Sequence, residues 1–154
     1  MARSRATIVG DRRVQTLLMQ MADRARGVEA HAWASVGDVI AAAMTKQFDT
    51  EGSFLNGRQW APLSPRYLGW KVARGLDPRR LHATGDMRAS LTGRPMAIEE
   101  YSDHRGRFGT NDEKAGFHQS GTSQMPARVI INVTEDLADD VNSALARYIF
   151  DERL

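Results

Sequence analysis

The sequence predicts an α+β fold, with N-terminal helices, a small antiparallel sheet of about three to four strands and a long C-terminal helix. Apolar residues recur at helical spacing in the first 48 residues and again after residue 134. Between these regions, short β-branched or alternating segments are separated by Gly, Pro, Asn and Asp, which is typical of strands joined by turns. This order of elements favours separate α and β parts rather than a parallel sheet.

The length of 154 residues predicts a single domain, residues 1–154. Its expected parts are helical (1–48), loop-rich α+β (49–133) and a C-terminal helix (134–154). Cysteine is absent, which excludes disulfides and thiolate metal sites. No apolar run approaches the roughly 20 residues that span a bilayer, so we expect no membrane partner and assembly in the cytoplasm.

Two helices are predicted in the N-terminal part. The first runs from about Asp11, a plausible cap, to Gly27, a plausible stop. The second ends near Phe48. Each carries an apolar stripe that could face the core or a neighbouring subunit: Val14, Leu17, Leu18, Met21, Ala25 and Val28 in the first, and Trp33, Val36, Ile40, Ala43, Met44 and Phe48 in the second.

The middle part is expected to contain two short helices and a loop between apolar anchors. Ser64-Pro65 is typical of an N-cap followed by proline at the first helical position, with Gly75 as the stop. A second short helix begins at Thr84-Gly85-Asp86 and ends at Gly93. Trp60 and Leu63 are expected to hold the preceding polar loop against the body.

Three strands are predicted, each by a different pattern. Residues 96–101 alternate apolar and polar side chains, 103–106 have the composition of a hairpin turn, and 107–110 form the return strand. Residues 128–133 contain a β-branched run and give the clearest strand signal. Residues 115–119 are expected to form a helical turn, and Thr134 to cap the last helix, with Glu135 and Asp136 at its positive end.

Charge is distributed unevenly although the net charge is only +2. The first 26 residues carry six arginines against two aspartates, and residues 135–153 carry six carboxylates against two arginines. Ends of opposite sign suit head-to-tail contact between subunits, because complementary patches steer association. Two ordinary solvated helix faces would give the same pattern, and charge alone does not separate these readings.

Catalytic and metal-binding patterns are absent from the sequence. No two of the four histidines have the i, i+4 spacing of a helical metal pair, and we expect no cofactor. His118 lies near Ser120 and Ser123, but nothing resembles a nucleophile elbow, so a structural histidine is favoured over a general base. The sequence therefore predicts a protein that is not an enzyme.

Five blocks, in order, carry a resemblance to a known family. They are Trp60, Pro62, Leu63 and Ser64 with Tyr67 and Lys71; Leu81, Thr84 and Gly85 ahead of Ser90 and Leu91; Gly109, Thr110 and Asn111; Phe117, His118, Gln119 and Gly121; and Pro126, Ala127 and Arg128. From about Phe48 onward the chain resembles the virion morphogenesis, or tail-completion, proteins of tailed bacteriophages. One difference is that Lys114-Ala115 stands where that family commonly has Tyr-Ala.

The resemblance implies a structural virion protein at the phage head–tail junction. Such a protein completes or terminates the tail, or joins it to the head connector. Its implied partners are its own copies in a closed ring, expected to be six-fold, and other neck and tail proteins: connector, tail terminator or tail tube. The expected location is the virion neck or tail, after assembly in the bacterial host. The implied structural or interface residues are Trp60, Pro62, Leu63, Tyr67, Thr84, Gly85, His118, Gly121, Pro126 and Arg128.

Two alternatives remain open at this point. The first is a small basic DNA-binding protein, favoured by the basic N-terminal arm with Arg3 and Arg5 and by a pI of about 9.3. A weaker form of it is non-specific contact with DNA in the lumen of a ring. The second alternative is a hydrolase that uses His118.

Overall fold

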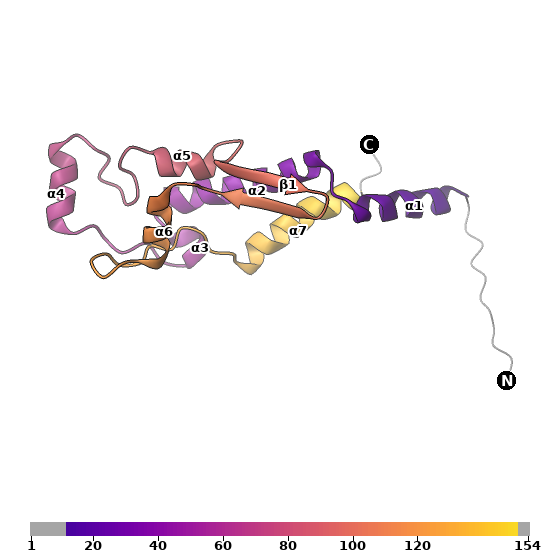
Figure 1. Cartoon of the computed structure of the whole chain (residues 1–154). Helices are drawn as coiled ribbons and strands as arrows, with labels where there is room; N and C mark the ends of the chain where they lie inside the picture. Colours follow the sequence, from indigo (N-terminus) through magenta and orange to yellow (C-terminus); the bar gives the residue numbers. More distant parts are fainter. Residues whose placement is uncertain (1–11, 151–154) are drawn as a thin grey trace.

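The computed structural model describes residues 12–150 and shows an elongated molecule built along one long helix. The central helix is α2 (Ala30–Asp49), and α7 (Glu135–Phe150) packs along it. At one end of the molecule, α1 (Arg12–Arg26) continues beyond both helices, and at the other end α4 (Pro65–Ala73) stands apart from the body (Figure 1). The two ends of the molecule are thus formed by two different helices.

Four of the remaining elements contact α2: α3 (Ser53–Asn56), α5 (Asp86–Thr92) and the antiparallel strands β1 (Ile98–Ser102) and β2 (Arg105–Gly109). The helix α6 (Glu113–Ser120) follows β2 in the chain. The strands pair in a register that joins Ile98 to Gly109 and Ser102 to Arg105, which leaves a two-residue turn. The turn therefore consists of residues 103–104 and is two residues shorter than the four-residue turn expected at 103–106.

The sheet is smaller than predicted. Within residues 12–150 it has two strands, and residues 128–133 are irregular, so the strand predicted there is wrong. The backbone of this segment bonds to side chains instead of to a strand. Gln119 Oε1 accepts from the N–H groups of Ile130 and Ile131, and Gln119 Nε2 donates to the Ile131 carbonyl. A side-chain amide here replaces the partner strand that a β-branched run usually finds.

The predicted helices are confirmed with small shifts in their ends. The Ser64 hydroxyl accepts from the Tyr67 N–H at the start of α4, and the Thr134 hydroxyl accepts from the Leu137 N–H at the start of α7. The helical turn expected at 115–119 is a longer helix, α6, capped by Asp112. The proposed cap Asp11 and residues 151–154 lie outside the described part of the chain.

The core lies between the C-terminal half of α2 and the loops around it. Phe48 is fully buried, and its ring makes edge contacts with the rings of Trp60 (5.5 Å) and His82 (5.9 Å). Leu91 from α5 and Ile130 from the irregular segment belong to the same core cluster as Phe48 and Trp60. The stripe predicted on the second helix thus faces the core, whereas α1 exposes Val14 and Leu18.

The hairpin is fixed to α2 by one arginine and one tryptophan. The Arg94 guanidinium donates to Asp38 on α2, to Glu99 on β1 and to the carbonyl of Ala34. The Trp33 indole N–H donates to the Ser102 carbonyl. These contacts involve the N-terminal half of α2, whereas Phe48 lies near its C-terminal end and packs against loops.

Gly52 provides a test of this packing. Its φ is +100°, and a Cβ there would lie 2.6 Å from the Trp60 ring. Gly57 has a φ of +66° but open space around it. We expect Gly52→Ala to lower the free energy of unfolding by about 1–3 kcal/mol more than Gly57→Ala does, because only the first substitution overpacks the core. Urea unfolding of both variants measures this difference, and equal losses would contradict it.

Candidate functional site

A groove of about 650 Å³, here called the loop groove, lies between α4, the loop before α5, and the loop after α6. The structure brings eight of the ten sequence-predicted candidates to its walls: Pro62, Leu63, Tyr67, Thr84, Gly85, His118, Pro126 and Arg128. Blocks far apart in the sequence therefore meet at one surface. Trp60 and Gly121 are not among the lining residues.

Arg128 joins two walls of the loop groove. It is 4% exposed, and its guanidinium donates to the carbonyls of Ala61 (2.8 Å) and Pro62 (2.9 Å), while its backbone N–H donates to the His118 carbonyl. Burial lowers the pKa of Arg128, but an arginine stays charged at physiological pH. The side chain thus fixes the 61–62 segment against the end of α6.

Trp60 and Gly121 do not line the groove, but they fix the segments that form its walls. The Trp60 indole N–H donates to the Val129 carbonyl at 2.7 Å, and the ring is buried. Gly121 has a φ of +74°, and a Cβ there would lie 2.7 Å from the backbone nitrogen of Ala127. A side chain at this position would open the loop that carries Pro126, so a glycine is required.

Gln47 is a buried residue that sequence reasoning missed. It is fully buried on α2, and its Oε1 accepts from the Leu55 N–H while its Nε2 donates to the carbonyls of Val129 and Ile130. Its position among the apolar residues of α2 is a weak indication that Gln47 is buried, and a buried glutamine must find hydrogen-bond partners. Gln47 links the end of α2 to the irregular segment after Arg128.

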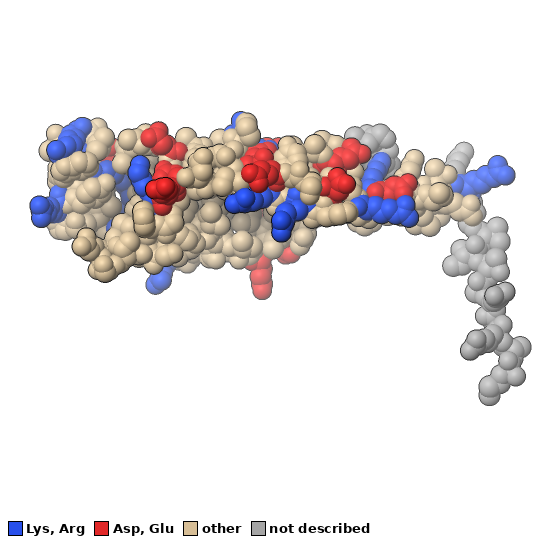
Figure 2. Space-filling view, viewed as in Figure 1, with Lys and Arg blue, Asp and Glu red and all other residues tan. Residues whose placement is uncertain are grey.

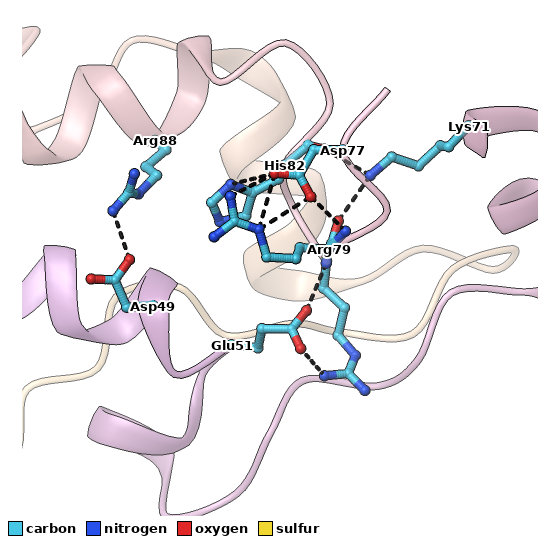
Figure 3. A network of polar contacts seen from close by, with 8 residues as sticks. Asp49, Glu51, Lys71, Asp77, Arg79, His82 and Arg88 are labelled. Atoms are coloured by element: carbon cyan, nitrogen blue, oxygen red, sulfur yellow. Dashed lines mark hydrogen bonds and ion pairs between the residues drawn. The ribbon is translucent and has the colours of Figure 1, made fainter. Parts of the chain in front are cut away.

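Lys71 is the second residue that sequence reasoning missed as a buried group. It is 1% exposed, and its ammonium donates to the carbonyls of Arg79 (2.8 Å) and His82 (2.7 Å). Figure 3 shows it reaching from α4 to the following segment. Burial lowers the pKa of Lys71, and the charges of Asp77 and Glu51 act in the opposite direction. This single side chain ties α4 to residues 79–82.

The segment held by Lys71 is also fixed by ion pairs (Figure 3). The Asp77 carboxylate accepts from the Arg79 guanidinium and backbone N–H, and these bonds hold the pKa of Asp77 well below its usual range. Glu51 binds both the backbone N–H and the guanidinium of Arg80. These bonds join Asp77 to Arg79 and Glu51 to Arg80, and together they fix the position of the 77–80 segment beside the groove.

The histidines at the groove make few polar contacts. His118 Nδ1 and His82 Nε2 are buried and have no hydrogen-bond partner within residues 12–150, so the expected backbone bond from the His118 side chain is absent at Nδ1. Burial lowers the pKa of both residues; the charge of Arg128 lowers that of His118 further, and Arg79 that of His82. A general base needs a nucleophile within hydrogen-bond reach, and no such contact is present for these two nitrogens.

We expect the protein to lose stability in mild acid, because the pKa values of His82 and His118 are lowered in the folded state. The unfolded chain takes up their protons near pH 6.5, while the folded chain resists protonation until lower pH. The free energy of unfolding is therefore expected to fall as the pH drops from 7.5 to 5. The double variant His82→Gln/His118→Gln should show a flatter profile in urea unfolding, whereas parallel curves for wild type and variant would contradict the prediction.

One side of α4 exposes aromatic residues beside the loop groove. Tyr67 and Trp70 are about two-fifths exposed and stack with their ring centroids 5.5 Å apart, and the Arg74 guanidinium lies 4.4 Å from the centre of the Trp70 ring. Tyr67 also lines the groove. Exposed aromatics next to an apolar hollow are typical of surfaces that bind another molecule.

Residues 12–150 were compared with the requirements of a metal site and of a membrane-spanning helix. In that part of the chain, no group of three or more His, Asp or Glu side chains could hold a metal ion. No helix there combines the length and the apolar character required to cross a membrane. The lining of the loop groove includes two buried cations, Lys71 and Arg128.

Comparison with known proteins places most of the chain in one family. The model of the phage virion morphogenesis family matches residues 9–149. The chain is similar to the Mu-like prophage FluMu G protein 1 of Haemophilus influenzae, with 30% identity over 115 residues that cover 73% of each chain. No solved structure matches.

Proposed function

Because the chain belongs to the phage virion morphogenesis family, we propose that it is a structural part of the phage head–tail junction. In this role it completes or terminates the tail, or joins the tail to the head connector, as a closed ring of six copies, and it catalyses no reaction. The observation that carries the proposal is the loop groove, where eight of the ten candidate residues meet and the buried side chains of Arg128 and Lys71 bond to backbone carbonyls.

The groove has the features of a docking surface for another neck or tail protein. Apolar side chains such as Leu63 and Met87 line it, and Tyr67 lies at its rim with an exposed ring. Its walls are pre-formed by the bonds of Arg128 and Lys71, so a partner segment would bind without a large ordering cost in this chain. A rigid, partly apolar surface suits permanent assembly.

A genetic test follows from this. In a phage that encodes the chain, deletion of the gene is expected to give heads and tails that remain separate in negative-stain images. The wild-type gene supplied in trans should restore joined particles. Complete infectious virions without the protein, or purified virions in which it is absent, would overturn the proposal.

The groove itself is tested by paired variants. Tyr67→Glu changes the groove rim, and Val72→Glu changes another exposed position of α4 that does not line the groove. Both variants should unfold like wild type, because both side chains are exposed. Only Tyr67→Glu is expected to fail in trans. If both variants restore infectivity, the loop groove is not the docking surface.

Contact with DNA is a second candidate function, favoured by the end of the molecule that carries α4. Residues 57–80 contain six basic residues and one aspartate, and Figure 2 shows Lys and Arg at this end. Exposed aromatics next to arginines suit non-specific binding of nucleic acid. We expect weak binding to DNA with a steep salt dependence. The absence of binding at low salt would remove this function; Arg3 and Arg5, which first suggested it, lie outside the described residues.

A further inference from the structure

One face of α4 carries two arginines beside two stacked aromatic rings. Arg66, Tyr67, Trp70 and Arg74 follow the spacing of a single helix face, and all four residues are exposed. Figure 1 shows α4 standing apart from the rest of the molecule. We call this surface the arginine face, and its exposure makes it available to another molecule.

The two rings hold the Arg74 guanidinium in place. Tyr67 lies one turn before Trp70, and the two rings stack with 5.5 Å between their centroids and 13° between their planes. Arg74 lies one turn after Trp70, and its guanidinium is 4.4 Å from the centre of the Trp70 ring. A guanidinium that rests on an aromatic face keeps the N–H groups at its edge available. Arg74 therefore presents ordered donors to an anion, at little further entropic cost.

The positive charge of the arginine face is not neutralised within the described chain. In residues 12–150, neither Arg66 nor Arg74 is in an ion pair, whereas the arginines at 79–80 are paired with carboxylates. Residues 52–76 contain four basic residues and no carboxylate. The adjacent loop groove is lined by three basic residues and one carboxylate, so it adds no negative charge. The molecule that this face binds is therefore expected to be an anion.

The positions of the two arginines suit the backbone of double-stranded DNA. Arg66 and Arg74 are eight residues apart in α4, which corresponds to about 12 Å along the helix axis. This separation is comparable with the width of the major groove of B-DNA, about 12 Å, whose two edges carry phosphates of different strands. Each guanidinium can bind a phosphate with two parallel hydrogen bonds. Trp70 is a poor platform for a base, because Tyr67 and Arg74 already lie against its ring.

We propose that the arginine face binds the phosphate backbone of double-stranded DNA, with Arg66 and Arg74 as the contacts and Trp70 as a positioning residue for Arg74. This inference rests on the DNA contact proposed above as a second function. It adds the residues that make the contact, and it assigns them to phosphates rather than to bases. Tyr67 also lines the loop groove, so the variants below leave it unchanged.

The salt dependence of binding measures the number of phosphate contacts. Fluorescence anisotropy of a labelled duplex of mixed sequence is recorded at increasing salt for wild type and for Arg66→Gln/Arg74→Gln. The slope of log affinity against log salt should become less steep by about 2, since each phosphate contact contributes about 0.9. The matched control is Arg105→Gln/Arg147→Gln, which removes the same charge from exposed positions on β2 and α7. Its slope should stay close to that of wild type.

Further variants separate the ring of Trp70 from the charges beside it. Trp70→Ala keeps both arginines but removes the support of Arg74, so affinity should fall about two- to fivefold. Trp70→Phe retains an aromatic face and should recover most of this loss. Arg74→Lys keeps the charge without the planar fork, so it should weaken binding and leave the salt slope nearly unchanged. Because these side chains are exposed, the melting curves should stay close to that of wild type.

Three results would overturn the inference, and they differ in what else they remove. If wild type binds no duplex at low salt, the DNA contact falls as well, while the junction role keeps its own genetic test. If Arg66→Gln/Arg74→Gln and the control pair change the slope equally, DNA binds elsewhere and only the arginine face falls. If poly-glutamate competes as well as unlabelled duplex at equal charge, the face binds an acidic protein segment instead of DNA.

Discussion

Replacement of Phe48 by alanine is expected to lower the free energy of unfolding by about 3–5 kcal/mol. Phe48 is 0% exposed, and its ring lies between those of Trp60 and His82. Its removal leaves a cavity beneath two segments, 57–64 and 79–85, that form walls of the loop groove. Collapse of these segments into the cavity is limited, because Trp60 is held by its bond to Val129.

Urea unfolding followed by circular dichroism measures this loss. The matched control is Phe117→Ala, which removes the same side chain from a position that is 57% exposed. The control should change stability by no more than about 0.5 kcal/mol. If the two variants lose similar free energy, the ring of Phe48 does not form the centre of the core.

Replacement of Arg128 by alanine is expected to lower the free energy of unfolding by about 2–4 kcal/mol. The guanidinium makes two hydrogen bonds from a charged donor, and its loss leaves the Ala61 and Pro62 carbonyls without those partners. The segment that carries Pro62 and Leu63 should then move away from α6. In the phage, Arg128→Ala is also expected to reduce particle joining at temperatures where the protein remains folded.

Two controls accompany this variant. Arg58→Ala removes an exposed arginine from the same end of the molecule and should be close to neutral. Arg128→Lys keeps the charge but lacks the planar fork that serves two carbonyls, so it should recover only part of the lost stability. Equal stability of Arg128→Ala and Arg58→Ala would show that the buried guanidinium does not hold the groove wall.

The sequence predicted the helices well because their signals are local. The caps Ser64 and Thr134 act on residues three positions away, and the apolar stripe of the second helix repeats within one element. The groove itself was not predicted: eight candidate residues line it, but nothing in the sequence placed them on one surface. Their meeting depends on contacts between segments that are distant in the chain, such as Arg128 with Ala61.

The strand predicted at residues 128–133 was wrong for the same reason, because the conformation of this segment depends on contacts with distant parts of the chain. A β-branched run indicates an extended backbone that needs hydrogen-bond partners, but it does not specify them. Here the partners are the side chains of Gln47, Asn56, Trp60 and Gln119, from four separate positions in the chain. Lys71 was missed for a related reason, because a lysine on a short amphipathic helix ordinarily lies in solvent.

The separation of α1 and α4 at opposite ends of the long α2 axis has an evolutionary consequence. Effects of substitutions at sites that share no contacts are usually additive, within about 0.3–0.5 kcal/mol. Substitutions in α1 and substitutions in α4 can therefore accumulate independently, because a change in one helix requires no compensating change in the other.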